Sequence, residues 1–162
     1  MDAPAIHYFA YGSNMNPARV RQRQMAFDEH MPAQLLGYAL AFNKRSHKYP
    51  GAASANVVTA GATNLVEGVV YRLKHVDQIQ VMDPFEGYPR LYRRFDLPVQ
   101  TLSGPVMAWT YIANAEHVVE GLKPARWYLQ HLLAAREHLS ADYYGRLAGV
   151  VCLPDSDNEP AR

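Results

Sequence analysis

The stretch that decides the fold reads Tyr8-Phe9-Ala10-Tyr11-Gly12-Ser13-Asn14-Met15 and lies near the start of the 162-residue chain. Residues 6–11 are almost entirely apolar or aromatic, which predicts a short buried strand. Gly12 permits the backbone angles that end such a strand. Asn16 and Pro17 supply an N-cap and a first helical residue, so we predict a helix from residue 17 to about residue 24.

The turn between this strand and this helix is a candidate ligand site. The first N–H groups of a helix have no partners inside the helix, and the helix start carries about half a positive charge. A carboxylate or phosphate could bind there, with Ser13 and Asn14 as side-chain donors. Neither GxGxxG nor a Gly-rich loop followed by Lys-Ser/Thr is present, so a nucleotide-phosphate site is not indicated. The residues alone leave a capped turn without a ligand as the alternative.

The remaining pattern predicts several strands followed by helices. Strands are predicted at residues 33–44, 55–59, 66–73, 92–99 and 106–113, with a hairpin turn at Ser103-Gly104. A helix is predicted at residues 75–82, ended by Asp83-Pro84 because a residue before proline disfavours helix. Two more are predicted at residues 124–138 and 141–147. This order predicts an α+β fold, a mixed, mainly antiparallel sheet with flanking helices that six strands could close into a small β-barrel.

Length and composition indicate one domain over residues 1–162, with a flexible tail at 155–162. The 16 Lys and Arg residues nearly balance the 15 Asp and Glu residues, which argues against nucleic acid or an anionic membrane as a partner. The single cysteine, Cys152, excludes an intrachain disulfide and is interpreted as a small buried residue. No secretion signal or membrane-spanning run is found, so we expect a cytoplasmic protein.

Glu86 is the candidate acid/base group. It lies between Phe85 and Gly87-Tyr88, at the predicted break between a helix and a strand. Apolar neighbours would raise its pKa toward neutrality, and such a carboxyl group can take up a proton and return it. The alternative is an exposed glutamate paired with Arg90 or Arg93. Asp83 is a weaker second candidate, because Asp before Pro is a common turn former.

Three features together resemble the γ-glutamylcyclotransferase-like (AIG2-like) family. Residues 8–15 are similar to its Y-F-A-Y-G-S-N-L signature, with Met15 in place of Leu. Residues 67–71, Glu-Gly-Val-Val-Tyr, resemble the strand before its catalytic glutamate, and Glu86-Gly87 resembles the E-G segment itself. Tyr128, after Pro124, resembles a tyrosine on a late helix. The resemblance covers about residues 6–148. The glutathione-specific branch typically reads Y-G-S-L where this chain has Asn14, so that branch is less favoured.

The resemblance implies the γ-glutamylcyclotransferase-like fold and the release of 5-oxoproline from γ-glutamyl amino acids or γ-glutamylamines. Glu86 would be the general acid/base, and no metal or organic cofactor would be required. The implied partner is a small γ-glutamyl compound. Two alternatives stay open: a binding protein of the same fold without turnover, and a γ-glutamyl-removing enzyme of a biosynthetic pathway. The residues expected to bind substrate are Tyr8, Tyr11, Gly12, Ser13, Asn14, Met15 and Tyr128.

Two other groups of residues have weaker interpretations. The seven histidines show no metal-ligand spacing, and His131 and His138 are interpreted as a packing or surface pair. Residues 44–49, Lys-Arg-Ser-His-Lys-Tyr, form a basic loop. We interpret that loop as the solvated rim of the active site rather than as a nucleic-acid patch.

Overall fold

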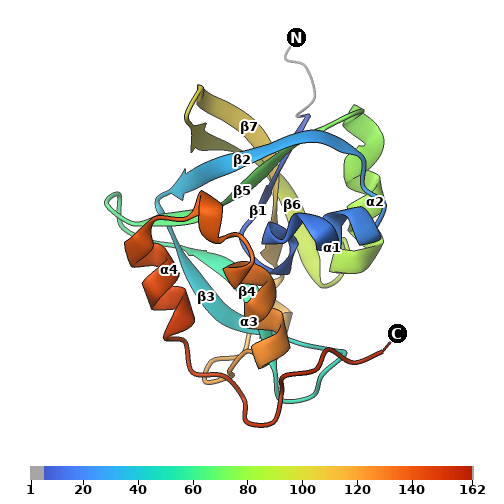
Figure 1. The fold of residues 1–162 in the computed structure, drawn as a ribbon. Coiled ribbons are helices and arrows are strands. Elements are labelled where there is room, and N and C mark those ends of the chain that lie inside the picture. Colours follow the sequence, from blue (N-terminus) through green and yellow to red (C-terminus); the bar gives the residue numbers. More distant parts are fainter. Residues whose placement is uncertain (1–5, 162) are drawn as a thin grey trace.

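The structure is a computed structural model that describes residues 6–161. Residues 1–5, where no secretion signal is predicted, and Arg162 lie outside this described part. Figure 1 shows the chain as a barrel with helices around it. The strands are β1 (His7–Ala10), β2 (Phe27–Leu36), β3 (Tyr38–Arg45), β4 (Ala53–Thr59), β5 (Leu65–Leu73), β6 (Tyr92–Thr101) and β7 (Gly104–Ala113). The helices are η1 (Ser13–Met15), α1 (Pro17–Gln22), η2 (Val76–Gln78), α2 (Ile79–Glu86), η3 (Ala115–His117), α3 (Arg126–Leu133), η4 (Arg136–His138) and α4 (Ala141–Ala148), where η marks 3₁₀ turns.

Five strands close into a barrel in the order β1-β5-β2-β6-β7. The β1–β7 pair that closes it is parallel, with His7 opposite Ala108, and the other pairs are antiparallel. The prediction of an α+β fold with a mixed, mainly antiparallel barrel is therefore confirmed. Strands β3 and β4 form a separate two-stranded sheet that extends from one end of the barrel.

Several predicted element boundaries are wrong, and β2 begins at Phe27 rather than at residue 33. Residues 33–44 are not one strand, because Gly37 takes a left-handed conformation (φ +81°) and turns the chain from β2 into β3. The helix near residue 80 does not stop before Pro84 but continues to Glu86 and ends at Gly87 (φ +65°). The Asp83 side chain is held there by Arg94 and Tyr111, and these tertiary contacts override the local preference of a residue before proline. Glu86 therefore lies on the last helical turn.

The helix predicted at residues 124–138 is shorter than expected. It ends at Leu133, and residues 136–138 form the separate 3₁₀ turn η4. His131 and His138 are thus not on one helix. Each has its own partners: His138 contacts His30 through ring nitrogens 2.8 Å apart, whereas His131 contacts Asn16 and Glu159.

The core has two clusters of apolar side chains. One fills the barrel, and the other lies between the barrel and the helices. The first includes Phe9, Leu35, Val66 and Val99. The second includes Met15, Tyr71, Met82, Leu129 and Leu132. Burying a side chain of this size contributes about 1.5–3 kcal/mol, so these clusters fix the strand–turn–helix unit and α3 against each other.

Residues 155–161, predicted to be part of a flexible tail, have specific contacts in the structure. The segment runs back along α3, where the Trp127 N–H donates to the Ser156 carbonyl oxygen, and Ser156 is 2% exposed. The Arg19 guanidinium donates to both carboxylate oxygens of Glu159, at 2.9 and 3.1 Å. This part of the chain is therefore packed onto the domain.

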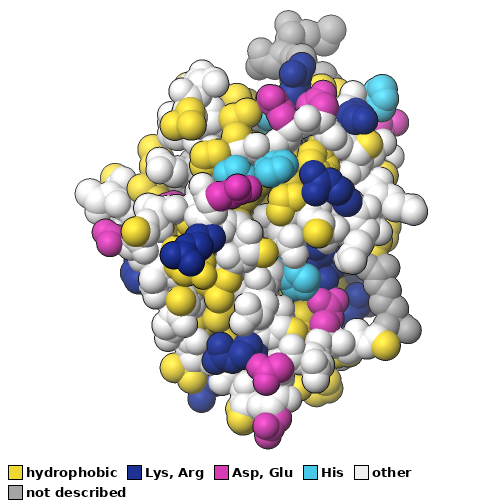
Figure 2. Space-filling view, viewed as in Figure 1, with side chains coloured by type: hydrophobic (Ala, Val, Ile, Leu, Met, Phe, Trp, Pro, Cys, Tyr) yellow, Lys and Arg dark blue, Asp and Glu magenta, His cyan; other side chains and the backbone are white. Residues whose placement is uncertain are grey.

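Charged side chains of both signs are interspersed on the face shown in Figure 2. This distribution agrees with the near balance of acidic and basic residues. Among residues 6–161, no helix is long and apolar enough to cross a membrane.

Candidate active site

A pocket of about 360 Å³ opens where β1, the β3–β4 sheet, α2 and α3 meet. Its lining includes the turn after β1, the end of α2, and aromatic side chains from α3, β6 and β7. The predicted site residues that line it are Tyr8, Tyr11, Gly12, Ser13, Asn14, Glu86 and Tyr128. The volume lies within the range of small-molecule sites, about 300–1,000 Å³.

The turn after β1 requires glycine at residue 12. A Cβ on Gly12 would lie 2.8 Å from the Tyr128 hydroxyl oxygen and 3.2 Å from the Ala55 Cβ. Tyr128 cannot easily move away, because its hydroxyl accepts a hydrogen bond from the Ala55 N–H at 2.9 Å. The predicted N-cap is present as well, since Asn16 Oδ1 accepts from the Ala18 N–H. The turn is therefore fixed between α3 and β4.

Glu86 faces this pocket from the last turn of α2, and 18% of its side chain is exposed. Its Oε1 accepts a hydrogen bond from Asn14 Nδ2 at 3.1 Å. Burial raises the pKa of Glu86 above its usual value, whereas the positive charges of Arg23 and Lys44 partly oppose that rise. A carboxyl group with a raised pKa beside a binding turn is suited to general acid/base chemistry.

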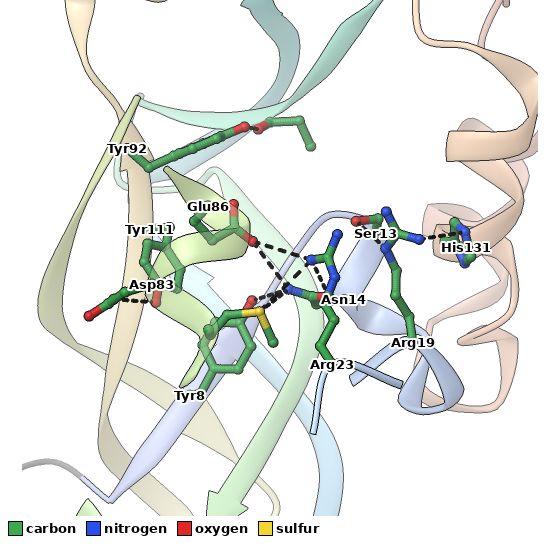
Figure 3. A network of polar contacts seen from close by, with 12 residues as sticks. Tyr8, Ser13, Asn14, Arg19, Arg23, Asp83, Glu86, Tyr92, Tyr111 and His131 are labelled. Atoms are coloured by element: carbon green, nitrogen blue, oxygen red, sulfur yellow. Dashed lines mark hydrogen bonds and ion pairs between the residues drawn. The ribbon is translucent and has the colours of Figure 1, made fainter. Parts of the chain in front are cut away.

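Asn14 connects the turn, Glu86 and α1 in one polar network (Figure 3). Besides Glu86, its Nδ2 contacts the Tyr8 hydroxyl at 2.9 Å, and its Oδ1 accepts from Arg23 Nη1 at 3.0 Å. Arg23 Nη1 also lies 4.0 Å from Glu86 Oε1. The Asn14 carbonyl accepts from the Tyr71 hydroxyl at 2.7 Å. These contacts hold the Glu86 carboxylate in position without a close ion pair.

Ser13 is held by a second group of contacts on the α3 side of the turn. Arg19 Nε donates to Ser13 Oγ at 3.2 Å, and Arg19 is itself bound by Glu159. His131 contacts both Arg19 and Glu159, and Figure 3 shows its contact with Arg19. Arg19 therefore links the C-terminal segment to the turn.

The structure separates the two candidate carboxylates. Asp83 is not among the pocket-lining residues. It accepts two hydrogen bonds from Arg94, at 2.8 and 3.1 Å, and one from the Tyr111 hydroxyl at 2.7 Å. The Asp83 carboxylate therefore has a structural role: its ion pair with Arg94 and its hydrogen bond from Tyr111 connect α2 to β6 and β7.

One predicted substrate-binding residue lies elsewhere. Met15 has no exposed surface and packs in the core between the barrel and the helices. It follows Asn14 on the 3₁₀ turn η1, which directs its side chain away from the pocket. The Met15 side chain is therefore part of the core and does not line the pocket. Methionine is similar in volume to the leucine of the family signature, so either residue can fill this core position.

Sequence reasoning missed several pocket residues: Arg19, Arg23, Lys44, Tyr92 and Tyr111. Arg19 and Arg23 lie four positions apart and are only 8% and 6% exposed. The signal available in the sequence was the four-residue spacing of the two arginines, which places them on one face of a helix directly after the turn. Lys44 was assigned to the solvated loop but is 5% exposed.

Within residues 6–161 no group of three or more His, Cys, Asp and Glu side chains is arranged to hold a metal ion.

Comparisons with solved structures support the fold. An uncharacterized human (Homo sapiens) protein has a TM-score of 0.79 at 22% identity, over 94% of this chain and 91% of that one. A structure titled gamma-glutamyl cyclotransferase has a TM-score of 0.80 at 21% identity, over 96% and 93%. A yeast gamma-glutamyl cyclotransferase specific to glutathione has a TM-score of 0.66 at 14% identity, over 90% and 94%. At these identities the likeness concerns the fold.

The comparison with curated proteins gives no significant match. The pattern of one family, described as "Gamma-glutamyl cyclotransferase, AIG2-like", matches residues 8–129, which include the turn after β1, Glu86 and Tyr128. The chain therefore belongs to the AIG2-like gamma-glutamyl cyclotransferase family.

Proposed function

We propose that the protein is a cyclotransferase that releases 5-oxoproline from γ-glutamyl amino acids or γ-glutamylamines. The observation that supports this most directly is the position of Glu86. Its side chain is 18% exposed and lines the same pocket as the Tyr11–Asn14 turn, and its carboxylate accepts a hydrogen bond from Asn14. A pocket used only for binding has little need of a carboxyl group whose pKa burial has raised.

In the proposed reaction the substrate attacks itself. Glu86 takes a proton from the substrate's α-ammonium group, and the freed amine nitrogen forms a bond to the γ-carbonyl carbon. Glu86 then returns this proton to the departing nitrogen as the bond between that nitrogen and the γ-carbon breaks. The new ring nitrogen keeps one hydrogen of the former ammonium group, and its other proton passes through Glu86 to the departing amine. The products are 5-oxoproline and the amine in its ammonium form, so no water or cofactor is consumed. One carboxyl group thus serves both proton transfers.

The role proposed for the turn is to hold the glutamyl part curled toward Glu86. Ser13 and Asn14 line the pocket, and Arg19 and Arg23 lie behind them. Placing an amine against its own carbonyl can lower the barrier by about 7–11 kcal/mol through proximity alone. The close fit of the turn supports this role, since a Cβ added at Gly12 would lie only 2.8 Å from the Tyr128 hydroxyl oxygen.

The test is a screen for 5-oxoproline release from γ-glutamyl amino acids, γ-glutamylamines and glutathione, each incubated with the folded protein. Release that depends on Glu86 is the expected result. If no substrate in the panel yields 5-oxoproline while 5-oxoproline itself binds in calorimetry, the protein is a binding protein of the same fold and the proposed activity is wrong.

A further inference from the structure

Lys44 is a buried cation in the pocket wall that the proposed proton transfers do not use. It lies near the end of β3, lines the pocket and is 5% exposed. Its Nζ lies 5.3 Å from the centre of the Tyr92 ring. In the described part of the chain, no carboxylate oxygen lies within 4.0 Å of this Nζ.

A buried ammonium group without a carboxylate partner is costly to the fold. Burial lowers the pKa of Lys44 below its usual value, and the negative charge of Glu86 only partly opposes this. Attraction between the ammonium group and the Tyr92 ring offsets part of the free energy lost when the ammonium group leaves water. An anion that enters the pocket would recover more, because an opposite charge stabilises the ammonium form.

Arg23 provides the contrast within the same pocket. It is buried to a similar degree, at 6% exposure, but its Nη1 donates to Asn14 Oδ1 and lies 4.0 Å from Glu86. Arg23 Nη1 therefore has an amide oxygen and a carboxylate oxygen within 4.0 Å, although the Nε of the same side chain has no hydrogen-bond partner in the described part of the chain. Lys44 has no such partner, so its charge is available to a ligand.

The position of Lys44 indicates which end of the substrate it would meet. In Figure 3, Asn14 and Tyr92 lie on opposite sides of the Glu86 carboxylate. If the glutamyl part occupies the turn next to Asn14, the bond to be broken lies near Glu86, and the leaving group extends toward Tyr92. Lys44 packs on that ring, and Ser46 and the exposed His47 continue the same wall toward solvent.

We propose that Lys44 binds a carboxylate group on the leaving group, so that the protein prefers γ-glutamyl amino acids to γ-glutamylamines. This inference rests on the proposed cyclotransferase activity and adds a specificity-determining residue to it. The reaction is unchanged: the bond to the leaving nitrogen breaks as described, and Lys44 takes no part in proton transfer.

The test uses two substrates that differ only in this carboxylate, γ-glutamylalanine and γ-glutamylethylamide. For the native protein we expect kcat/KM to be about 10–100-fold higher for γ-glutamylalanine, the size expected for a hydrogen bond to a charged group. Lys44→Met keeps the chain length and removes the charge. It should remove most of this preference by lowering kcat/KM for γ-glutamylalanine much more than for γ-glutamylethylamide, and Lys44→Arg should restore part of the preference. Any change in the pKa of Glu86 that follows from the lost charge affects both substrates alike and leaves their ratio unchanged.

Lys74→Met is the matched control, because Lys74 is exposed and lies outside this pocket. It should leave both values of kcat/KM unchanged. Equal kcat/KM for the two substrates in the native protein would overturn the inference whether or not the Lys44 variants fold. An equal loss for both substrates in Lys44→Met would overturn it too.

Failure of the proposed function has a different signature. If the folded native protein releases 5-oxoproline from neither substrate, nor from any other compound of the panel, the proposal of cyclotransferase activity is wrong. The ratio of the two Kd values, measured by calorimetry, then replaces the ratio of kcat/KM. Tighter binding of γ-glutamylalanine that is lost in Lys44→Met would still support the carboxylate contact, and equal Kd values would refute it.

Discussion

Replacing Glu86 with Gln tests the central assignment. Glutamine keeps the size of the side chain, and its carbonyl oxygen can still accept the hydrogen bond that Asn14 Nδ2 gives to Oε1 at 3.1 Å. It cannot accept a proton from an ammonium group. The variant should therefore retain the pocket and lose the chemistry.

The size of the expected rate loss follows from the assignment of both proton transfers to Glu86. Loss of a positioned general acid or base costs about 10²–10⁴-fold in rate. We expect the upper end of this range for Glu86→Gln, equivalent to about 5 kcal/mol of transition-state stabilisation. The assay is the rate of 5-oxoproline release from the preferred substrate of the panel.

The stability of the same variant has a predictable sign. A carboxyl group whose pKa is raised by folding destabilises the folded state at pH values above that pKa, because its charged form is better hydrated in the unfolded chain. Glutamine has no such charge. The melting temperature of Glu86→Gln at pH 7 should therefore equal or exceed that of the native protein.

Asp83→Asn is the control for position. It weakens the contacts with Arg94 and Tyr111, so it should cost about 1–3 kcal/mol of stability, yet leave most of the activity because Asp83 lies outside the pocket. A well-folded Glu86→Gln protein with nearly native activity would refute the catalytic assignment. If Asp83→Asn alone abolished activity, the catalytic carboxylate would be Asp83.

Three further predictions concern the pH profile, the turn and its ligand. In a pH–rate profile, the acidic limb of kcat/KM should lie above the usual glutamate pKa of 4.5. Arg23→Met should move this limb to higher pH, because Arg23 is the main charge that lowers the pKa of Glu86. An unchanged limb in the variant would contradict this prediction. Gly12→Ala should lower activity, because the added Cβ would lie 2.8 Å from the Tyr128 hydroxyl oxygen. Tyr128→Phe removes that hydroxyl, so it should restore part of the activity of Gly12→Ala. A kinetic double-mutant cycle that shows no coupling between the two positions would count against this steric contact. Crystals soaked with formate or 5-oxoproline should show density at the Tyr11–Asn14 turn, and an unoccupied turn at high ligand concentration would argue against the assigned substrate end.

The local sequence carried enough information for the elements around the turn. The apolar run at residues 6–11, the glycine at 12, and the cap formed by Asn16 and Pro17 are short-range features, and the structure confirms each of them. For Glu86 the local residues left an exposed glutamate open as the alternative, and the resemblance of Glu86-Gly87 to the family's E-G segment made it the catalytic candidate. Its placement in one pocket with Gly12 is confirmed.

The boundaries that failed depended on contacts between distant parts of the chain. Local preference places a helix end before Pro84, whereas Arg94 and Tyr111 hold Asp83 in the helix. The polar segment after residue 155 was expected to be flexible from its composition, whereas in the structure Arg19 binds Glu159 and the Trp127 N–H donates to the Ser156 carbonyl oxygen.

The sequence by itself determined the strand–turn–helix unit, because capping, turn chemistry and apolar periodicity act within a few residues. The choice of Glu86 as the acid/base candidate came from the resemblance of its segment to the family's E-G motif. Only the tertiary structure decided which charges face the pocket. Asn14 and Glu86 are 72 positions apart, and their contact requires β1 and α2 to pack on the same barrel. The burial of Arg23 and Lys44 has the same origin, since desolvation of a charge is set by every element packed around it and not by its neighbours along the chain.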